Sequence, residues 1–368
     1  MTLCETSRGN SAYVAAGFQM IRNIEISNFR CFSTQSISDA KRLNIITGDN
    51  GAGKTSLLEA IFLPLSVGSE VALRMRQLRG LDGLFAAPRG RIEESLWGDF
   101  FHNFDMTRRI TLALSGDGSA ARRLDISRGR AGVTVPMDLD GPNPPVISAP
   151  VTFTWTNADG ESFQATPVFK QGEISFPDTG EDMPDFFFIP ALAVTGSAEN
   201  AGRFSDLSKV NRQDSIVKTF IREFPQLEGL SLEVSAGSPA IFATIKGMDK
   251  KVPLPSVSSG INRMLAIMLT IASRPRSIVL VDEIENGIHW KHFPFLWRAI
   301  VSLLRENDSQ LFAVTHSGEC LRAAAQATGK KTDDVELWQM ERIDGEHHLT
   351  RFSGGRMKSA IESGIDVR

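Results

Sequence analysis

The feature that most constrains this chain is a glycine-rich segment, Gly48–Thr55, with the sequence GDNGAGKT. An apolar run, Leu43–Thr47, precedes it, and a stretch with helical spacing, Ser56–Leu63, follows it. Strand, glycine loop and helix in this order form the context that a phosphate-binding loop requires. The glycines let successive backbone N–H groups turn toward phosphate oxygens, and the positive end of the helix attracts the same anion. The segment therefore predicts binding of a nucleoside triphosphate.

Two side chains of this loop have predicted chemical roles. Lys54 is expected to reach the outer phosphates and to assist catalysis, and the Thr55 hydroxyl is expected to ligate magnesium. An ordinary glycine turn that contains a lysine is the alternative, and the flanking strand and helix disfavour it. We therefore expect ATP and magnesium as ligands. The predicted nucleotide contacts of the loop are Asn50, Gly51, Ala52, Gly53, Lys54, Thr55 and Ser56.

Composition limits the class of protein without identifying it. A chain of 368 residues has room for two ordinary domains, or for one nucleotide-binding domain with a large insertion. Its 40 basic and 43 acidic residues give a net charge of -3, which does not indicate a nucleic-acid-binding protein, although a local basic face remains open. The three distant cysteines, Cys4, Cys31 and Cys320, exclude a disulfide framework and a Cys-x-x-Cys metal site.

No segment of the sequence is expected to cross a membrane. The longest apolar run, Met264–Ala272, is far shorter than the roughly 20 residues that a membrane-spanning helix needs. Arg8 followed by Ala12–Ala16 weakly imitates a signal peptide. Residues 1–19 are nevertheless expected to be a disordered leader, or the product of a misplaced start codon, because the recognisable domain begins at Met20. An ATP- and magnesium-dependent site favours a cytoplasmic location.

The chain is expected to form a nucleotide-binding core in two parts, 20–66 and 204–345, and to finish with a closing strand and helix at 346–368. Between the two parts, glycine, proline and arginine become frequent and the strands become short, which predicts an inserted β-rich arm at 67–203. The arm has no heptad pattern and is therefore not a coiled coil. Its predicted strands are Ile110–Leu114, Leu124–Ser127 and Val151–Trp155.

The core is expected to alternate strands with helices, which gives an α/β fold. Ser277–Val281 and Gln310–Val314 are fully apolar, as is typical of parallel strands buried on both faces. Leu207–Phe224 has the spacing of one helix. Further strands are expected at Ile21–Phe29, Ile37–Ile46, Phe186–Ile189, Leu230–Val234, Ile241–Ile245, Val335–Met340 and His347–Phe352, and further helices around Met264 and at Phe293–Arg305 and Lys358–Ser363.

An acidic pair, Asp282–Glu283, follows an apolar strand. Asp282 lies 228 residues after Lys54. Asp282 is expected to hold magnesium, directly or through water, and Glu283 to orient and deprotonate the attacking water. Acidic pairs at strand ends also occur as helix caps. The phosphate loop in the same chain favours the catalytic interpretation.

A serine-glycine loop, Ser258-Ser259-Gly260, begins the helix that precedes the acidic pair. It is a second anion-binding helix terminus, and one active site has little use for two. We expect it to cap the γ-phosphate held by the phosphate loop of a neighbouring subunit, so that ATP joins a dimer. A plain serine N-cap is the alternative, and on the loop alone it would be preferred.

His316 follows the apolar strand that ends at Thr315, and a helix is expected from Ser317. A histidine at this position can reach the γ-phosphate and steady the water that Glu283 activates. Isolated histidines are often structural, so His316 depends on its place after the other three elements.

These four elements, in this order, resemble the ABC-type ATPase head of transporters, chromosome-maintenance proteins and double-strand-break repair ATPases. The resemblance covers residues 20–65 and about 204–345, and it implies a two-lobed P-loop NTPase with a mixed sheet. A closer resemblance is to the stand-alone AAA family ATPases related to the overcoming-lysogenization-defect (OLD) nucleases. It rests on Ile24–Phe32, Arg203–Leu207, Asp282–His289 and Thr315–Cys320.

The resemblance implies roles for several residues. Ser258, Ser259 and Gly260 become the signature loop that acts in trans, and Glu285–His289 becomes the loop that crosses the dimer interface and brings Asn286 to the nucleotide. Arg30 is implied to touch nucleotide. The signature reads VSSGI rather than LSGGQ, and His289 stands where transporter heads carry aspartate, so the strength of the trans contacts stays open. The magnesium-sensing glutamine is also open between Gln77 and Gln171.

The chain ends about 50 residues after His316, which leaves no room for the metal-binding domain of OLD nucleases. The first hypothesis is therefore an oligomerising ATPase that senses a trigger and controls a separately encoded effector, expected to be a nuclease, in bacterial anti-phage defence. The second is a repair ATPase similar to RecF that binds DNA, and the third is a nucleotide-gated scaffold with slow turnover. A local basic face for DNA would need the arm residues Arg74, Arg76, Arg79, Arg89 and Arg91, which are otherwise a solvated surface.

Overall fold

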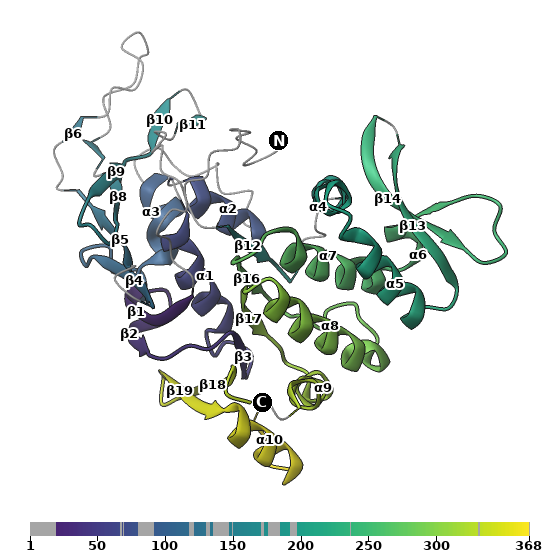
Figure 1. The fold of residues 1–368 in the computed structure, drawn as a ribbon. Helices are drawn as coiled ribbons and strands as arrows, with labels where there is room; N and C mark the ends of the chain where they lie inside the picture. Colours follow the sequence, from purple (N-terminus) through teal and green to yellow (C-terminus); the bar gives the residue numbers. More distant parts are fainter. Residues whose placement is uncertain are drawn as a thin grey trace.

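The computed structural model describes residues 20–66, 68, 70–79, 92–117, 121–129, 133–134, 147–148, 150–170, 173–175, 185–191, 197–235, 237–329 and 332–367. The predicted leader, Gln171, Arg89 and Arg91 lie outside these residues, and the Gln77 side chain does as well. The described strands include two six-stranded sheets, one antiparallel and one largely parallel, and helix α1 (Lys54–Leu65) contacts both (Figure 1).

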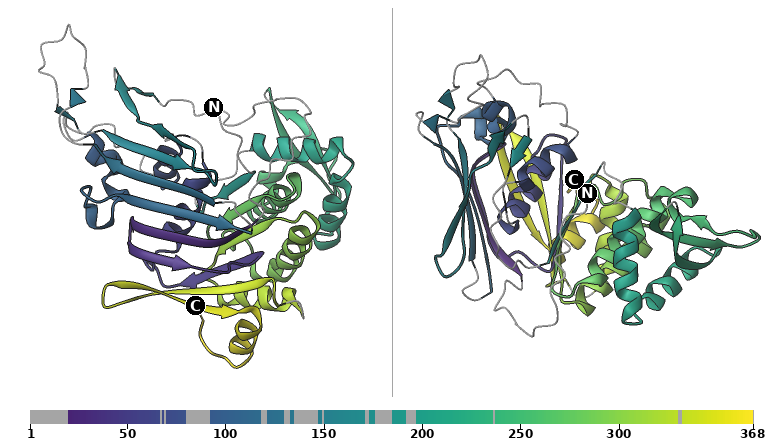
Figure 2. Two further views of the ribbon diagram at one scale, coloured as in Figure 1. Left: turned by 60° about the vertical axis from the view of Figure 1, so that its left-hand side comes forward. Right: turned by 90° about the horizontal axis from the view of Figure 1, so that it is seen from above.

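The antiparallel sheet begins with the two N-terminal strands and continues with strands of the middle region. Its order is β2-β1-β4-β5-β8-β9. β4 pairs with β1, and its alternate residues Ile110, Leu112 and Leu114 are buried in the same core as α1. Figure 2 shows this sheet as an outer layer of the molecule. The bounds are β1 Ile21–Phe29, β2 Phe32–Ile37, β4 Ile110–Gly116, β5 Ala121–Arg128, β8 Val151–Thr156 and β9 Ser162–Ala165.

This topology corrects the expectation of a separate arm at 67–203. The strands lie close to their predicted positions, but they extend the sheet of β1 instead of forming a body of their own. Burial of their apolar residues against α1 explains the difference, since short strands with one apolar face need a partner layer. The boundary at 203/204 also falls inside helix α4 (Ser197–Lys209). The middle region therefore supports the phosphate-loop helix.

The second large sheet carries the phosphate loop at the end of one of its inner strands. Its order is β12-β16-β17-β3-β18-β19, with all neighbours parallel except β18 and β19. Because the strands are parallel, the carboxyl ends of β3, β16 and β17 meet at one edge, where ligands bind in such sheets. The bounds are β12 Phe186–Ile189, β16 Ile278–Val281, β17 Gln310–Val314, β3 Leu43–Gly48, β18 Val335–Ile343 and β19 Glu346–Ser353.

Helices cover the other face of this sheet and create a second core. They are α4, α5 (Gln213–Glu223), α7 (Ser259–Ser273), α8 (Phe293–Glu306), α9 (Gly318–Thr328) and α10 (Gly354–Glu362), with the short α6 at Leu254–Val257. The helical spacing noted at Leu207–Phe224 belongs to two helices, α4 and α5. Asn211 takes a left-handed φ of 57° and separates α4 from α5.

A small sheet, β13-β14-β15, projects beside these helices (Figure 1). Its bounds are β13 Leu227–Ser235, β14 Ser238–Ile245 and β15 Val252–Pro253. The other described elements are α2 (Glu70–Leu78), α3 (Ile92–Trp97), the 3-10 turns at Gly98–Phe100, His102–Phe104 and Trp290–His292, and the strand pairs Val133–Thr134 with Ile147–Ser148 and Val168–Lys170 with Glu173–Ser175. No helix within the described residues combines the length and apolar character of a membrane span.

Candidate active site

The phosphate loop joins β3 to α1, as the sequence predicts. Its three glycines, Gly48, Gly51 and Gly53, have φ values of 134°, 81° and 96°, a region that other residues rarely adopt. A Cβ atom on Gly48 would also collide with the carbonyl oxygen of Met340 on the neighbouring strand β18. The loop can therefore keep this shape only with glycine at these positions.

Lys54 lies at the first turn of α1 and is 5% exposed. Its ammonium group donates hydrogen bonds to the carbonyl oxygens of Gly48 and Asp49, at 2.7 and 2.6 Å. Burial lowers the pKa of Lys54, and the nearby carboxylates, first of all Asp282, oppose that shift. A triphosphate offers oxygens of higher charge than these carbonyls, so Lys54 is placed to exchange one set of acceptors for the other.

Thr55 and Asp282 meet although 227 residues separate them. The Thr55 hydroxyl donates a hydrogen bond to Oδ2 of Asp282 at 2.9 Å. Asp282 is 6% exposed, and burial raises the pKa of its carboxyl. Its Oδ1 atom has no hydrogen-bond partner among the described residues. Hydroxyl and carboxylate oxygens are the ligands that magnesium prefers, so this pair fits the predicted metal.

Glu283 directly follows Asp282 and has a left-handed φ of 47°, which is uncommon for a residue other than glycine. Its carboxylate is partly exposed, and Oε1 lies 3.8 Å from Nε2 of His316 at the end of β17. The structure thus brings together two residues that the sequence places at the ends of neighbouring strands. An exposed carboxylate beside a histidine can hold and deprotonate a water molecule.

Glu285 contributes a contact that the sequence does not reveal. Its Oε1 atom accepts hydrogen bonds from the backbone N–H groups of His316 and Ser317, at 2.7 and 3.1 Å. The loop after β16 is therefore tied to the loop after β17. The neighbouring Asn286 donates its side-chain amide to the carbonyl oxygen of Ala191 at 2.7 Å, so its predicted contact with nucleotide stays a prediction.

The serine-glycine loop begins helix α7. Ser258 is the N-cap, and its hydroxyl accepts a hydrogen bond from the N–H of Ile261 at 3.3 Å. The next two residues, Ser259 and Gly260, occupy the first helical positions, whose N–H groups have no partner within a helix. Gly260 packs so closely against the carbonyl of Gly287 that a Cβ atom would collide with it. The loop is therefore held against the segment that follows Glu285.

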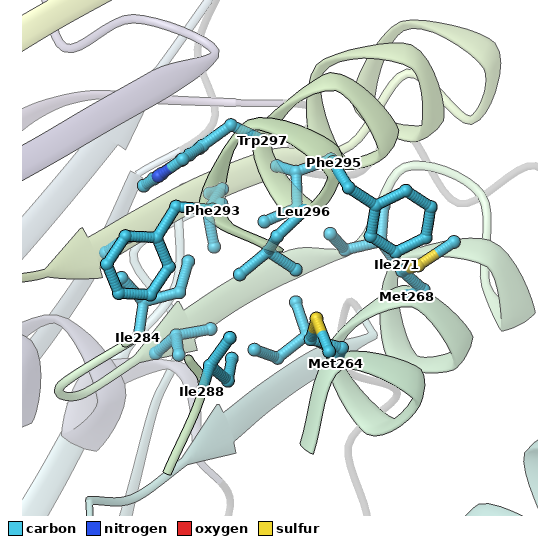
Figure 3. Packing of buried hydrophobic residues seen from close by; sticks show 14 of the residues in the cluster. Met264, Met268, Ile271, Ile284, Ile288, Phe293, Phe295, Leu296 and Trp297 are labelled. Carbon is cyan, nitrogen blue, oxygen red and sulfur yellow. The ribbon is translucent and has the colours of Figure 1, made fainter. Parts of the chain in front are cut away.

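Two buried isoleucines fix that following segment. Ile284 and Ile288 are 0% and 7% exposed, and both point into the core between α7 and α8 (Figure 3). Met264 of α7 and Phe293 of α8 belong to the same core. Between the two isoleucines, Asn286 and Gly287 remain exposed. The geometry thus presents a short rigid surface beside the signature loop.

Arg263 is a second residue that the sequence analysis misses. Its guanidinium donates hydrogen bonds to the carbonyl oxygens of Asp282, Glu283 and Pro190, at 2.8, 2.9 and 3.1 Å. Burial lowers the pKa of this arginine, against the attraction of the surrounding carboxylates. A charged residue on the otherwise apolar buried face of α7 is the signal that would have found it. Arg263 links the helix of the signature loop to the backbone of the acidic pair.

Arg30, which is expected to touch nucleotide, takes part in a buried ion-pair network. Its side chain is 7% exposed, and the guanidinium pairs with Glu59 at 2.5 Å and Asp99 at 3.0 Å. It also lies over the ring of Phe100, 4.7 Å from the centroid. Because Glu59 belongs to α1, Arg30 anchors the phosphate-loop helix to the antiparallel sheet. Its predicted contact with nucleotide stays a prediction.

The same buried network engages two of the arginines that a basic face would need. Arg76 pairs with Asp99, and Arg79 pairs with Glu59 at 2.6 Å. Burial raises the pKa of Glu59, whereas Arg30 and Arg79 oppose that shift. Arg76 and Arg79 therefore stabilise the packing of the fold through these ion pairs, which counts against a role in a DNA-binding surface.

His347 of β19 contacts the phosphate loop itself. Its Nδ1 atom lies 2.9 Å from the carbonyl oxygen of Ala52, which can only accept, so Nδ1 carries the proton. The ring also packs edge-on against Phe32. The sequence analysis assigns His347 only to a closing strand, because a contact with a backbone carbonyl leaves no pattern in residue types. The C-terminal hairpin thus supports the phosphate loop through β19.

Comparison with known proteins identifies the family of this chain. Residues 43–321 match the family described as "AAA domain, putative AbiEii toxin, Type IV TA system". An ATP/GTP phosphatase of Helicobacter pylori is 22% identical over 338 residues, which are 85% of this chain and 89% of that protein. The chain belongs to this AAA domain family, and it is an ATPase.

Shorter segments of the chain are similar to DNA-repair proteins. RecF of Idiomarina loihiensis is 58% identical over 43 residues, which are 12% of each chain. The Rad50 ATPase of Methanopyrus kandleri is 33% identical over 93 residues, 25% of this chain and 10% of that protein. Among solved structures, an Smc head bound to the C-winged helix domain of ScpA is 14% identical, with a TM-score of 0.49 over 90% of this chain and 98% of that one.

Proposed function

We propose that the chain hydrolyses ATP in a site completed by a second copy of itself, so that ATP controls association. The observation that carries the proposal is the serine-glycine loop. Ser259 is exposed at the first position of α7, and no backbone hydrogen bond joins the N–H groups of Ser259 and Gly260 to the phosphate loop within the described part of the chain. A free helix terminus favours an anion, and the γ-phosphate held by another copy is the anion that this fold supplies.

The catalytic steps follow from the side chains on the β-strand ends. Lys54 and the N–H groups of the phosphate loop would hold the phosphates, and Thr55 and Asp282 would hold magnesium, which neutralises phosphate charge when bound. Glu283 would accept a proton from water as the water oxygen attacks the γ-phosphorus. The bond from that phosphorus to the bridging oxygen breaks, and ADP leaves with the electron pair. His316 would keep the water in place.

The substitution Glu283→Gln tests this assignment. We expect hydrolysis to fall at least about 100-fold, because the amide cannot accept the proton, while ATP binding remains. The mass of this variant in solution should double when ATP and magnesium are added. Glu223→Gln is a suitable control, since Glu223 lies on α5, where it pairs with His292. Unchanged hydrolysis in Glu283→Gln would remove Glu283 as the base.

The output of such an ATP-dependent dimer would be passed to another protein. We propose that this effector is a separately encoded nuclease. The proposal follows the resemblance to ATPases of anti-phage defence. The description of the matching family names a toxin system but no separately encoded effector, so this part of the proposal rests on the resemblance alone. Co-purification from the native host, followed by a nuclease assay with and without ATP, tests this part. An isolated ATPase with no bound protein would count against it.

A DNA-binding repair ATPase is the second candidate, favoured by the local similarity to RecF. It predicts that duplex DNA stimulates hydrolysis and that the stimulation falls steeply with salt. The internal pairing of Arg76 and Arg79 counts against it. Indifference of the ATPase rate to DNA at low salt would exclude this candidate.

A further inference from the structure

The five tryptophans of the sequence all lie within the described residues, and one differs from the rest. Trp97, Trp155, Trp297 and Trp338 are at most 1% exposed, whereas Trp290 is 58% exposed. Its indole stacks on His289 with an interplanar angle of 28°, and the ammonium of Lys291 lies 5.9 Å from the ring centroid. These neighbours hold the indole in one orientation in water. An exposed, oriented tryptophan is the residue type most often found at the energetic centre of an interface.

The position of Trp290 connects it to the signature loop. It is three residues from Gly287, whose carbonyl contacts Gly260, so the two Cα atoms of 287 and 290 are at most about 11 Å apart. A protein interface of ordinary size covers about 800 Å² on each partner, equivalent to a disc of about 16 Å radius. If a second copy brings its phosphate loop to this end of α7, an interface of that size is wide enough to include Trp290.

The charges of the two surfaces are complementary. Beside Trp290, Lys291 is exposed and carries a positive charge. The tip of the phosphate loop exposes Asp49 and Asn50. In a head-to-tail pair these surfaces face each other, and opposite charges favour the correct orientation.

We propose that Trp290 is an anchor of the contact with a second copy of this chain, an inference that rests on the proposed function. The occupant is the surface around the other copy's phosphate loop. Each dimer then contains two such contacts related by the twofold axis. The anchor lies outside the nucleotide-binding residues, so its loss should weaken association without changing how one copy binds ATP.

Fluorescence provides the test, because collisional quenching by acrylamide in the folded protein reports mainly on Trp290. The full chain with Glu283→Gln is measured with and without ATP and magnesium, and its mass is followed in parallel. We expect quenching to drop at least about threefold as the mass doubles. Trp290→Phe should remove the quenchable signal and identifies its source.

A substitution supplies the second measurement. Trp290→Ala in the same background should raise the dimer dissociation constant at least about tenfold and leave the affinity for ATP unchanged. Val234→Ser, which alters an exposed side chain on β13 of the projecting sheet, is the matched control and should have no effect. A dimer in which Trp290 stays fully quenchable would overturn the anchor alone. A protein that stays monomeric with ATP would overturn the proposed function and the anchor with it.

Discussion

The two helix termini that can bind anions differ in how complete they are. The phosphate loop has its own cation, Lys54, and next to it Thr55, which bonds to Asp282 in the pair predicted to hold magnesium. The signature loop has neither, and offers only backbone N–H groups and two serine hydroxyls at the start of α7. A complete site can bind a charged ligand alone. The signature loop can contribute only to a ligand that is already held elsewhere.

The phosphate loop and the signature loop also differ in how much of the protein surrounds them. The phosphate loop is enclosed by Met340 and His347 of the C-terminal hairpin, which fix its backbone. The signature loop is fixed only on its inner side, where Gly260 meets Gly287, and Ser259 remains exposed. One loop is thus built to enclose phosphates and the other to meet a surface.

Removal of the cation should disable the complete site. Lys54→Ala loses two charge-assisted hydrogen bonds to phosphate, at about 1.5–3 kcal/mol each, so ATP affinity should fall between about 100-fold and 10,000-fold. Isothermal titration with the full chain measures this affinity. Lys41→Ala is the matched control, because Lys41 lies at the other end of β3 and pairs with Asp39. Equal ATP affinities for Lys54→Ala and the unaltered chain would contradict the assigned role.

A negative charge added to the signature loop should disable it without affecting the phosphate loop. Ser258→Asp keeps an N-cap oxygen for α7 but places a negative charge beside the expected γ-phosphate, a repulsion of about 3 kcal/mol. We expect dimerisation with ATP to weaken about 100-fold, measured by sedimentation in the Glu283→Gln background. ATP binding by the monomer should not change. Ser258→Asn caps the helix without charge and should largely retain the dimer, and equal loss in both variants would indicate a purely structural serine.

A change in Arg263, which links the helix of the signature loop to the acidic pair, should give a smaller effect. Arg263→Lys keeps the charge but not the fork that bonds to the carbonyls of Asp282 and Glu283. We expect kcat to fall about tenfold while KM stays constant, because the backbone that carries the base is less well held. Steady-state kinetics at saturating magnesium provide both values. Arg274→Lys, at the exposed end of α7, is the control, and an unaltered kcat in Arg263→Lys would show that the guanidinium does not position Glu283.

The support from the C-terminal hairpin should give the smallest effect, and one with a specific pattern. The side-chain amide of asparagine can take the place of Nδ1 of histidine, whereas that of glutamine reaches the place of Nε2. His347→Asn should therefore preserve the bond to Ala52, and His347→Gln should raise KM for ATP about fivefold, the worth of one neutral hydrogen bond. His348→Gln, which changes the next residue, should behave as the unaltered chain. Equal KM values for the two His347 variants would argue against this bond.

Much of the fold could be predicted because its signals are local. The glycine loop, the apolar strands β16 and β17, and the positions of Asp282 and His316 at strand ends can all be read within short windows of sequence. A short stretch of sequence shows which residues follow a buried parallel strand. Because the carboxyl ends of parallel strands share one edge of the sheet, these residues are expected to lie together. The place of the candidate site therefore followed from the sequence, while the chemical roles of its residues remain proposals.

The remaining features depend on partners that are distant in sequence. The pairing of β4 with β1 changed a supposed arm into part of the head, and no short window shows which strand another strand will join. Arg30 meets Glu59 and Asp99 only after α1 and the antiparallel sheet have packed. The contacts of Arg263 are with backbone carbonyls, which every residue possesses. They leave no trace in the choice of side chain.

Mixing two disabled chains tests the central claim most directly. In the Glu283→Gln background, Lys54→Ala retains its signature loop and Ser258→Asp retains its phosphate loop. Neither variant should form a stable dimer with ATP and magnesium alone. Together they should form a heterodimer that holds one ATP, which native mass spectrometry can count. If the mixture contains only monomers, with ATP bound to the Ser258→Asp chain alone, the signature loop does not act on a second copy and the account is contradicted.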